Sequence, residues 1–335
     1  MIDNFFKEAK YKKNKENFLQ KQSIISKIFV FLLKNKKIFF SIIFLIFLFL
    51  ISILIPLIYP YDYFTELGIF KNASADNSFS LLPPFKFSLS EQKQMQSGQF
   101  IWPHIFGTDR NGRDYFIRVI YAIRISLCVG LISAFIVLII GVIYGAIAGM
   151  KGGKTDLIMM RIVDGLYALP DLIAIIFFSA IIKEFLHIND TSVVISLLPI
   201  FVVFMLFYWI DTAVLIRSQV LLLKKRDFVT ASKTMGASNF FIIKKHIIPN
   251  CTNIIIVSLT KRIPTAIFTE TTLAFLGLGI SKPIPSLGGL INEEINEILN
   301  YPWLALIPAI IVSLIVLAFY FIGEGLRARL NPVSN

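Results

Sequence analysis

Long runs of apolar residues, separated by shorter polar stretches, set the pattern of this chain. Residues 38–58 are apolar at almost every position, and only Ser41 and Ser52 interrupt them with polar side chains. A transmembrane helix needs about 20 mostly apolar residues, because the hydrocarbon core is about 30 Å thick and a helix rises about 1.5 Å per residue. The pattern therefore predicts an all-α, polytopic membrane protein with six transmembrane helices. The five further runs lie at residues 126–149, 165–182, 192–216, 254–279 and 303–322.

The first apolar run is expected to remain in the protein as a transmembrane helix. A cleaved signal peptide is the alternative, but its apolar region would be shorter and would lead into a cleavage site of small residues. No such site follows Pro56 and Pro60. We therefore interpret residues 38–59 as an uncleaved first helix.

Lysine and arginine are distributed unevenly between alternate loops. Ten lysines lie within residues 1–37, and an excess of these bases marks the cytoplasmic flanks of transmembrane helices. Alternation then places the turn at residues 151–154 and the loop at residues 217–250 in the cytoplasm, together with the C-terminal tail. The distribution predicts a multi-pass protein of the inner (cytoplasmic) cell membrane with both its N- and C-termini in the cytoplasm.

Composition and charge agree with a membrane protein. Apolar residues make up 56% of the chain and charged residues only 16%, whereas soluble domains contain about 45–50% and about 25%. The net charge of +12 would suit nucleic-acid binding if the bases formed one polar face, but here they flank apolar runs. Cys128 and Cys251 are too few and too differently placed for a disulfide framework. These observations exclude a soluble globular enzyme, and nothing in them indicates redox chemistry.

The motifs of common enzymes are absent from the sequence or lie in the wrong context. Residues 148–155 come within one residue of a phosphate-binding loop, but Ala148 stands where its first glycine belongs, and a predicted membrane helix precedes it rather than a strand. We interpret this stretch as a tight cytoplasmic turn. The three histidines are scattered, and the chain contains neither H-E-x-x-H nor G-x-S-x-G. The sequence predicts no catalytic, cofactor-binding or metal-binding residues.

The large cytoplasmic loop carries apolar residues at helical spacing. Phe228, Ala231 and Met235 recur at such intervals before Gly236, and further apolar residues recur up to Ile247. This pattern predicts a short amphipathic helix, a break at the glycine and a second helix that ends before Pro249. Because a loop in water has no lipid in which to bury an apolar face, it lies on the bilayer or docks into another protein.

The loop resembles the "EAA" signature of ABC importer permeases. Ala231 and Gly236 keep the spacing of that signature, and residues 246–249 close it, whereas Thr230 and Ser232 replace its glutamate and second alanine. The resemblance implies that the loop couples to a cytoplasmic ATPase. The residues expected to make this contact are Asp227, Phe228, Ala231, Met235, Gly236, Ala237, Phe240, Ile247 and Pro249.

A second set of motifs resembles the oligopeptide, dipeptide and nickel permeases. It includes residues 275–279 and residues 323–327, and the resemblance covers about residues 104–332. Together these motifs resemble the C-type permease subunit of an oligopeptide ABC importer. The motif on the outer face, just before the second helix, consists of Gly107, Thr108, Asp109, Gly112, Arg113 and Asp114.

The resemblance implies a transport subunit with no enzymatic activity, built on the type I importer architecture. Such a subunit forms half of the peptide pathway beside a second homologous permease. Two cytoplasmic ATPase subunits would bind ATP and Mg²⁺, and an external binding protein would deliver the peptide. Dipeptides and nickel are alternative substrates within the family. A self-sufficient secondary transporter would show inverted repeats, and none is visible.

This interpretation divides the chain into five parts. They are a basic cytoplasmic segment (1–37), a first transmembrane helix (38–59), an external segment (60–112), a permease core of five transmembrane helices (113–326) that contains the coupling loop (217–250), and a cytoplasmic tail (327–335). The external segment either meets the binding protein or forms a loosely packed cap.

Four charged residues within the apolar runs are candidates for the transport pathway: Asp211, Lys261, Arg262 and Glu270. A base at the centre of a bilayer costs about 2.5–3.5 kcal/mol. Lys261 and Arg262 must therefore lie near the cytoplasmic interface, pair with an acid, or face a water-filled pathway. Glu270 is a candidate pathway residue or a buried partner.

Overall fold

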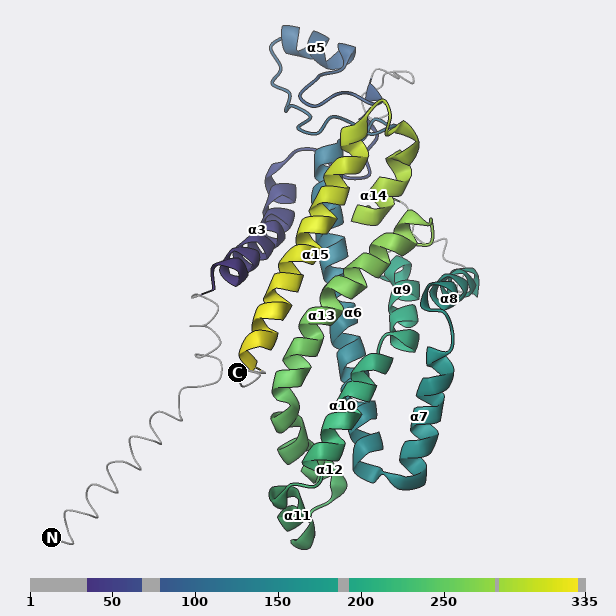
Figure 1. Cartoon of the computed structure of the whole chain (residues 1–335). Helices are drawn as coiled ribbons and strands as arrows, with labels where there is room; N and C mark the ends of the chain where they lie inside the picture. The colour runs from purple at the N-terminus through teal and green to yellow at the C-terminus, as the bar shows by residue number, and fades with distance from the viewer. Residues whose placement is uncertain (1–34, 68–78, 186–192, 281–282, 331–335) are drawn as a thin grey trace, which may run out of the picture.

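The computed structural model describes residues 35–67, 79–185, 193–280 and 283–330. The chain folds as a bundle of long helices with a small cap at one end and two short helices at the other (Figure 1). Among the described residues, the only β-type pairing is an isolated bridge between Thr108 and Asp114. The predicted all-helical, polytopic fold class is confirmed.

Within the part of the chain that the structure describes, five helical stretches are long and apolar enough to cross a membrane. The first is α3 (Lys36–Ile58) and the second α6 (Tyr115–Lys151). The third, Leu197–Leu223, joins most of α9 (Val193–Phe207) to α10 (Ile210–Leu223). The fourth, Asn239–Phe275, ends with α13 (Ile248–Phe275), and the fifth lies in α15 (Pro302–Leu330).

The run predicted at residues 165–182 does not form one long helix. It is divided between α7 (Gly153–Tyr167) and α8 (Asp171–Phe185). Pro170 stands between the two helices, where its missing N–H and the restriction that it places on the preceding residue interrupt a helix. Within the described residues, only a shorter apolar helix, Ile173–Ile182, remains of this expected span.

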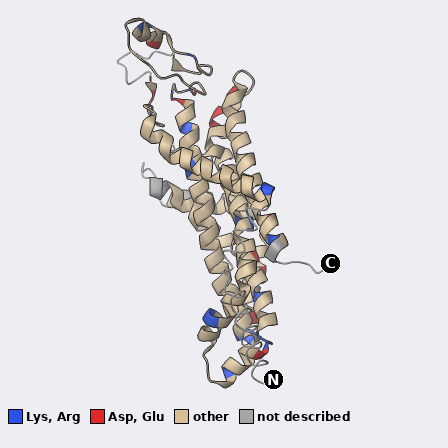
Figure 2. Cartoon of the chain, turned by 90° about the vertical axis from the view of Figure 1, so that its left-hand side faces the viewer, with Lys and Arg blue, Asp and Glu red and all other residues tan. Residues whose placement is uncertain are grey.

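Helix α6 forms the centre of the bundle and packs closely against α10. Gly141, Gly145 and Gly149 lie one turn apart on α6, and a side chain at Gly145 would overlap the carbonyl oxygen of Ala213 on α10. Small residues at this spacing let two helix backbones approach closely. Many charged residues lie toward the two ends of the bundle, and a smaller number lie between them (Figure 2).

The described part of residues 60–112 forms a cap over one end of α3 and α6 (Figure 1), which we call the outer end after the predicted topology. The cap contains α5 (Leu89–Gln96), which begins with a capping box between Ser88 and Glu91. Glu91 and His104 are fully buried. The alternative of a loosely packed cap is therefore wrong for these residues.

The opposite end carries α11 (Asp227–Thr234), α12 (Asn239–Ile242) and a π-helical turn, η2 (Ile243–Ile247), which leads directly into α13. The expectation that the second helix ends before Pro249 is wrong. Pro249 lies in the first turn of α13, directly after the π-helical turn.

Two short elements join α13 to α15 at the outer end: α14 (Leu287–Glu294) and the 3₁₀ turn η3 (Ile295–Glu297). Helix α15 continues through residue 327, so the expected boundary between core and tail falls inside a helix.

Candidate functional site

The α11–α12 segment, which comprises residues 227–249, has one buried face and one exposed face. Val229, Ile242 and Ile247 are buried in a core that also contains Met150 of α6 and Val220 of α10. On the other side, 81% of Met235 and 75% of Phe240 are exposed, and Phe228 is exposed as well. The segment is thus fixed to the bundle by one face and presents apolar side chains to the surroundings with the other.

Most residues expected to contact an ATPase lie on the exposed side. Asp227, Ala231, Gly236 and Pro249 are exposed, and Ala237 is half-buried. Ile247 is the exception, because only 1% of it is accessible. Its expected contact with a partner is therefore wrong. A regular helical spacing predicts that Ile247 shares a face with the exposed apolar residues. The π-helical turn instead directs its side chain into the core.

Gly236 joins α11 to α12 in a left-handed conformation, with φ of +82°. The N–H of Gly236 donates to the carbonyl of Lys233 (2.9 Å), and the N–H of Ala237 donates to the carbonyl of Ser232 (3.0 Å). This geometry closes the C-terminal end of α11. A side chain at Gly236 would meet no atom of the described chain within 4 Å, so the glycine is required by its backbone conformation rather than by crowding.

A polar groove of about 560 Å³ lies between α10, α13 and α15. Asp211, Lys261 and Arg262, three of the four charged candidates, line it together with Arg327. Arg262 Nη2 donates a hydrogen bond of 2.7 Å to Asp211 Oδ2. One of the three alternatives for Arg262, pairing with an acid, is thus present in the structure.

The groove lies at the level where α15 ends. Gly323 on the last turns of α15 approaches Thr260 on α13, and Arg327 follows one turn later. A second cavity of about 160 Å³ is lined by Asp211, Arg262 and Thr265 as well, so the ion pair stands between the two spaces. Lys261 and Arg262 therefore line a cavity at the level where α15 ends, and the interface and pathway alternatives stay predictions.

Glu270 lies away from this groove. It is fully buried, and its Oε2 accepts a hydrogen bond of 3.0 Å from Ser126 on α6. Ser126 Oγ in turn accepts the N–H of Leu287 at the start of α14 (3.2 Å). Glu270 is therefore buried, and the hydrogen bond it accepts comes from a hydroxyl group rather than from Lys261 or Arg262.

The outer-face motif builds a tight loop before α6. A side chain at Gly107 would overlap the carbonyl oxygen of Leu82, and Gly107 has a φ of +77°. Thr108 Oγ1 accepts the N–H of Leu82 (2.9 Å). Gly112 also has a positive φ, of +70°. Asp114 caps α6 by accepting the N–H of Ile117 (3.0 Å). These contacts explain the residue types of the motif by the fold of the loop.

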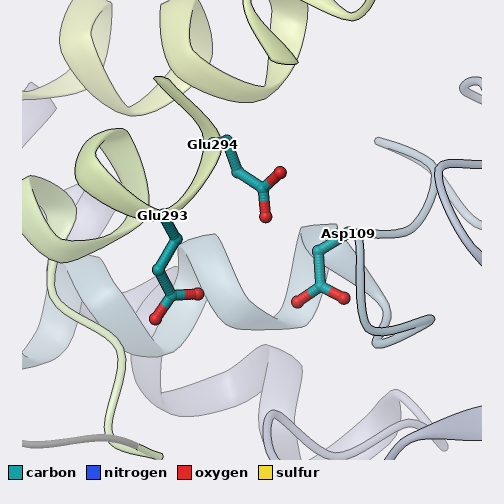
Figure 3. A group of neighbouring side chains, drawn as sticks. All are labelled: Asp109, Glu293 and Glu294. Carbon is teal, nitrogen blue, oxygen red and sulfur yellow. The ribbon is translucent and has the colours of Figure 1, made fainter. Parts of the chain in front are cut away.

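An ion cluster joins this loop to α6 and α14. Asp109 Oδ2 accepts from Arg113 Nε (2.7 Å) and from Arg118 Nη1 (2.5 Å). Glu293 Oε2 accepts from Arg118 Nη2 (2.9 Å) and Arg113 Nη2 (3.2 Å). Glu294 lies beside them, and the carboxyl groups of Asp109, Glu293 and Glu294 lie close together (Figure 3).

Three carboxyl groups within 4.8 Å of one another could hold a metal ion, but two arginines already supply positive charge to two of them. Glu294 Oε2 has no hydrogen-bond partner among the described residues. Burial, reinforced by the negative charge of Asp109, raises the pKa of Glu294 to about 7. A proton on Glu294 would relieve the excess negative charge, so the cluster does not require a cation.

His104 is a second buried ionic site, in the cap. Its Nδ1 lies 2.7 Å from Asp114 Oδ2, and its Nε2 lies 3.3 Å from Glu91 Oε1. Burial alone would lower the pKa of His104, but the hydrogen bonds and charges of Asp114 and Glu91 outweigh it and raise the pKa to about 9. The imidazolium therefore ties α5 to the start of α6.

Sequence reasoning missed Glu91, His104, Arg118 and Glu293 as members of these clusters. Arg118 and Glu293 are 175 positions apart, and Glu91 and His104 belong to a segment without apolar periodicity. The sequence offers one signal for these clusters: Arg118 is a basic residue within an apolar helix, and such a residue is expected to pair with an acid.

Comparison with known proteins identifies the family of the chain. Residues 141–332 match the model of the binding-protein-dependent transport system inner membrane component, and residues 26–84 match the N-terminal TM domain of oligopeptide transport permease C. The chain belongs to this family of peptide permeases. It is a transport subunit without catalytic activity of its own, and members of the family carry no cofactor because ATP binds to partner ATPases.

Three curated relatives illustrate the similarity. The dipeptide transport system permease protein DppC of Bacillus subtilis (strain 168) is 38% identical over 300 residues, which cover 89% of this chain and 82% of that protein. The oligopeptide transport system permease protein OppC of the same organism is 39% identical over 229 residues, covering 68% of this permease and 72% of the relative. The OppC protein of Escherichia coli (strain K12) is 35% identical over 244 residues, or 73% and 76%.

Proposed function

We propose that this permease forms half of the translocation pathway of an ATP-driven oligopeptide importer and docks a cytoplasmic ATPase on its α11–α12 segment. The observation that carries the proposal is the exposed apolar face of that segment, with Met235 and Phe240 at its centre. A patch of large apolar side chains outside the membrane is typical of a protein interface. A short helix seated in a partner's groove is a common form of such an interface.

The buried face of the segment would transmit the partner's motion. Val229, Ile242 and Ile247 embed the segment in the core shared by α6, α10 and α13. When the ATPase subunits close on ATP, a displacement of the segment would therefore move these three helices together. Rigid-body rotation of this kind converts one open side of a transporter into the other.

The same proposal includes the remaining partners. A second homologous permease would complete the pathway, two ATPase subunits would bind ATP and Mg²⁺, and an external binding protein would supply the peptide. The external protein would meet the cap, where Phe85, Leu89 and Phe100 are exposed. The groove between α10, α13 and α15 would form the cytoplasmic mouth of the pathway.

We also propose six membrane crossings with both termini in the cytoplasm. Helix α6 ends near the end of α10, because Lys224 Nζ approaches the carbonyl of Gly149 (3.5 Å). The chain must therefore return to the start of α9 through α7 and α8, which together would make the sixth crossing. A reporter fused after Lys233 should lie in the cytoplasm and one inserted at Ser97 outside, and an external reporter at Lys233 would contradict both the topology and the docking role.

Dipeptides are the second candidate substrate class, because the relative aligned over 300 residues is named a dipeptide permease. Uptake of labelled di-, tri- and pentapeptides should be measured in cells with and without this chain. Loss of uptake of the longer peptides on deletion supports oligopeptide import. Loss restricted to dipeptides would assign the second candidate, and unchanged uptake of all three would contradict peptide transport.

A further inference from the structure

The polar groove between α10, α13 and α15 contains more positive charge than its own carboxylate balances. Lys261, Arg262 and Arg327 line it, and Asp211 is the one acid in the lining. Arg262 is held by Asp211 at 2.7 Å. Among the described residues, no carboxylate forms an ion pair with Lys261 or Arg327. Two cations in one groove are thus available to an anionic group.

The groove also offers neutral hydrogen-bonding groups and an apolar wall. Gln219 and Thr265 lie in its polar part, and Leu215, Ile254 and Val257 in its apolar part. Its volume of about 560 Å³ falls within the range of about 300–1,000 Å³ that is usual for small-molecule sites. Such a lining suits a ligand with one charged end, amide groups and side chains of mixed character.

We propose that this groove is a binding subsite for the carboxylate end of the transported peptide, with Lys261 and Arg327 as its cationic ligands. The inference rests on the proposed function and names the chemistry that the cytoplasmic mouth would recognise. A charge-assisted hydrogen bond to a carboxylate is stronger than one between neutral groups. The partly enclosed setting of the groove further strengthens it relative to bulk water.

The Asp211–Arg262 pair would then limit the subsite on one side. The pair lines both this groove and the neighbouring cavity, so a peptide passing between them must move past it. An anionic lipid headgroup offers the same negative charge as a peptide carboxylate. The side chain of Asp211 is 52% exposed and could pair with the amino end of a short peptide, a group that the headgroup of phosphatidylglycerol lacks.

The test uses the complete complex in inside-out membrane vesicles, so that peptide reaches the cytoplasmic mouth without the external binding protein. A cysteine replaces Thr265, an exposed residue of the groove, in a chain that lacks Cys128 and Cys251. The rate at which it reacts with a negatively charged methanethiosulfonate reagent is measured with trialanine and with trialanine amide. Retention of the ATPase is measured on the same vesicles, and ATP-driven peptide uptake is measured in the intact cells from which they are prepared.

Trialanine should slow the reaction about fivefold at about four times its dissociation constant, because only the unoccupied groove reacts. The amide, which lacks the carboxylate, should leave the rate unchanged. The pair of substitutions Lys261→Gln and Arg327→Gln should abolish protection by trialanine. Lys154→Gln, a matched loss of an exposed cation outside the groove, should preserve it.

Several results would overturn the subsite. Equal protection by trialanine and its amide would show that the carboxylate is not recognised. Protection that survives the double substitution would place the ligand elsewhere, and absence of protection would exclude binding in the groove. A rate that depends on phosphatidylglycerol in reconstituted vesicles but not on peptide would assign the groove to lipid. Each of these results with intact peptide uptake would leave the proposed function standing, whereas absence of uptake by the unmodified complex would contradict that function itself.

Discussion

Arg118 at the start of α6 donates a hydrogen bond of 2.9 Å from Nη2 to Oε2 of Glu293 at the end of α14. The same guanidinium binds Asp109 through Nη1, and only 1% of the Arg118 side chain is accessible. One buried cation therefore holds the loop before α6, α6 itself and α14 together. The outer end of the permease is tied by charge as well as by apolar packing.

Replacing Arg118 with methionine should strongly destabilise the outer end. The change leaves Asp109 and Glu293 buried with less positive charge, and removal of one partner of a buried ion pair costs about 3–5 kcal/mol. We expect a lower thermal unfolding temperature of the purified subunit and lower abundance in the membrane.

A double-mutant cycle with Glu293→Gln isolates the contact itself. The two substitutions together should cost less than the sum of their separate costs, because residues that share one network are coupled. Strictly additive costs would mean that the Arg118–Glu293 pair does not hold the two helices together.

The imidazolium of His104 should make stability depend on pH. Its pKa in the folded protein, about 9, lies above the ordinary value of about 6.5. The bound proton therefore stabilises the fold fully below pH 6.5, and this contribution is lost as the pH rises through 9. A shift of this size corresponds to a few kcal/mol, on the order of 1.4 kcal/mol for each pH unit.

The measurement is the thermal stability of the detergent-solubilised complex between pH 6 and pH 10, compared with that of His104→Gln. Glutamine retains a hydrogen-bonding group but carries no charge, so the variant should be less stable near neutral pH and should lose less stability as the pH rises. Parallel curves for the two proteins would show that the proton on His104 does not stabilise the cap.

The loss of stability caused by a substitution at Gly236 should depend on how readily the new residue adopts a left-handed backbone conformation. Its φ of +82° costs most residues about 1–2 kcal/mol, and asparagine less. Gly236→Ala should lower the thermal stability more than Gly236→Asn, because asparagine adopts the left-handed conformation more readily and a Cβ atom at this position meets no described atom within 4 Å.

Gly236→Glu adds a negative charge at the proposed docking surface. Its membrane abundance should match that of Gly236→Ala, since both carry the same backbone strain. Peptide uptake and ATPase co-purification should nevertheless be lost, because a charge must be desolvated at an interface. Uptake equal to that of Gly236→Ala would contradict the position of this turn in the interface.

Apolar periodicity predicts the long helices and the amphipathic character of α11, because both depend on local spacing. The break between α7 and α8 depends on Pro170, which stands inside an apolar run that otherwise has enough length. The inward direction of Ile247 depends on a π-helical turn, which shifts the helical register in a way that a regular spacing does not show.

The buried ion clusters were less accessible to sequence reasoning. His104 pairs with Glu91 and Asp114 only because the cap folds back over α6. Arg118 meets Glu293 only because the chain returns through α13 and places α14 beside the start of α6. Contacts between distant segments follow from the packing of the helices, and a single sequence carries no direct record of that packing.

The most direct test of ATPase docking on the α11–α12 segment is the retention of the ATPase by Met235→Glu. Met235 is 81% exposed, so the substitution should leave the fold and membrane abundance unchanged, while Lys154→Glu provides a charge change at the same end of the bundle but outside the α11–α12 segment. We expect the amount of ATPase co-purified with Met235→Glu to fall about tenfold, equivalent to about 1.4 kcal/mol of binding free energy, whereas Lys154→Glu should retain the ATPase. Full retention of the ATPase and normal peptide uptake by Met235→Glu would contradict the docking role of the segment.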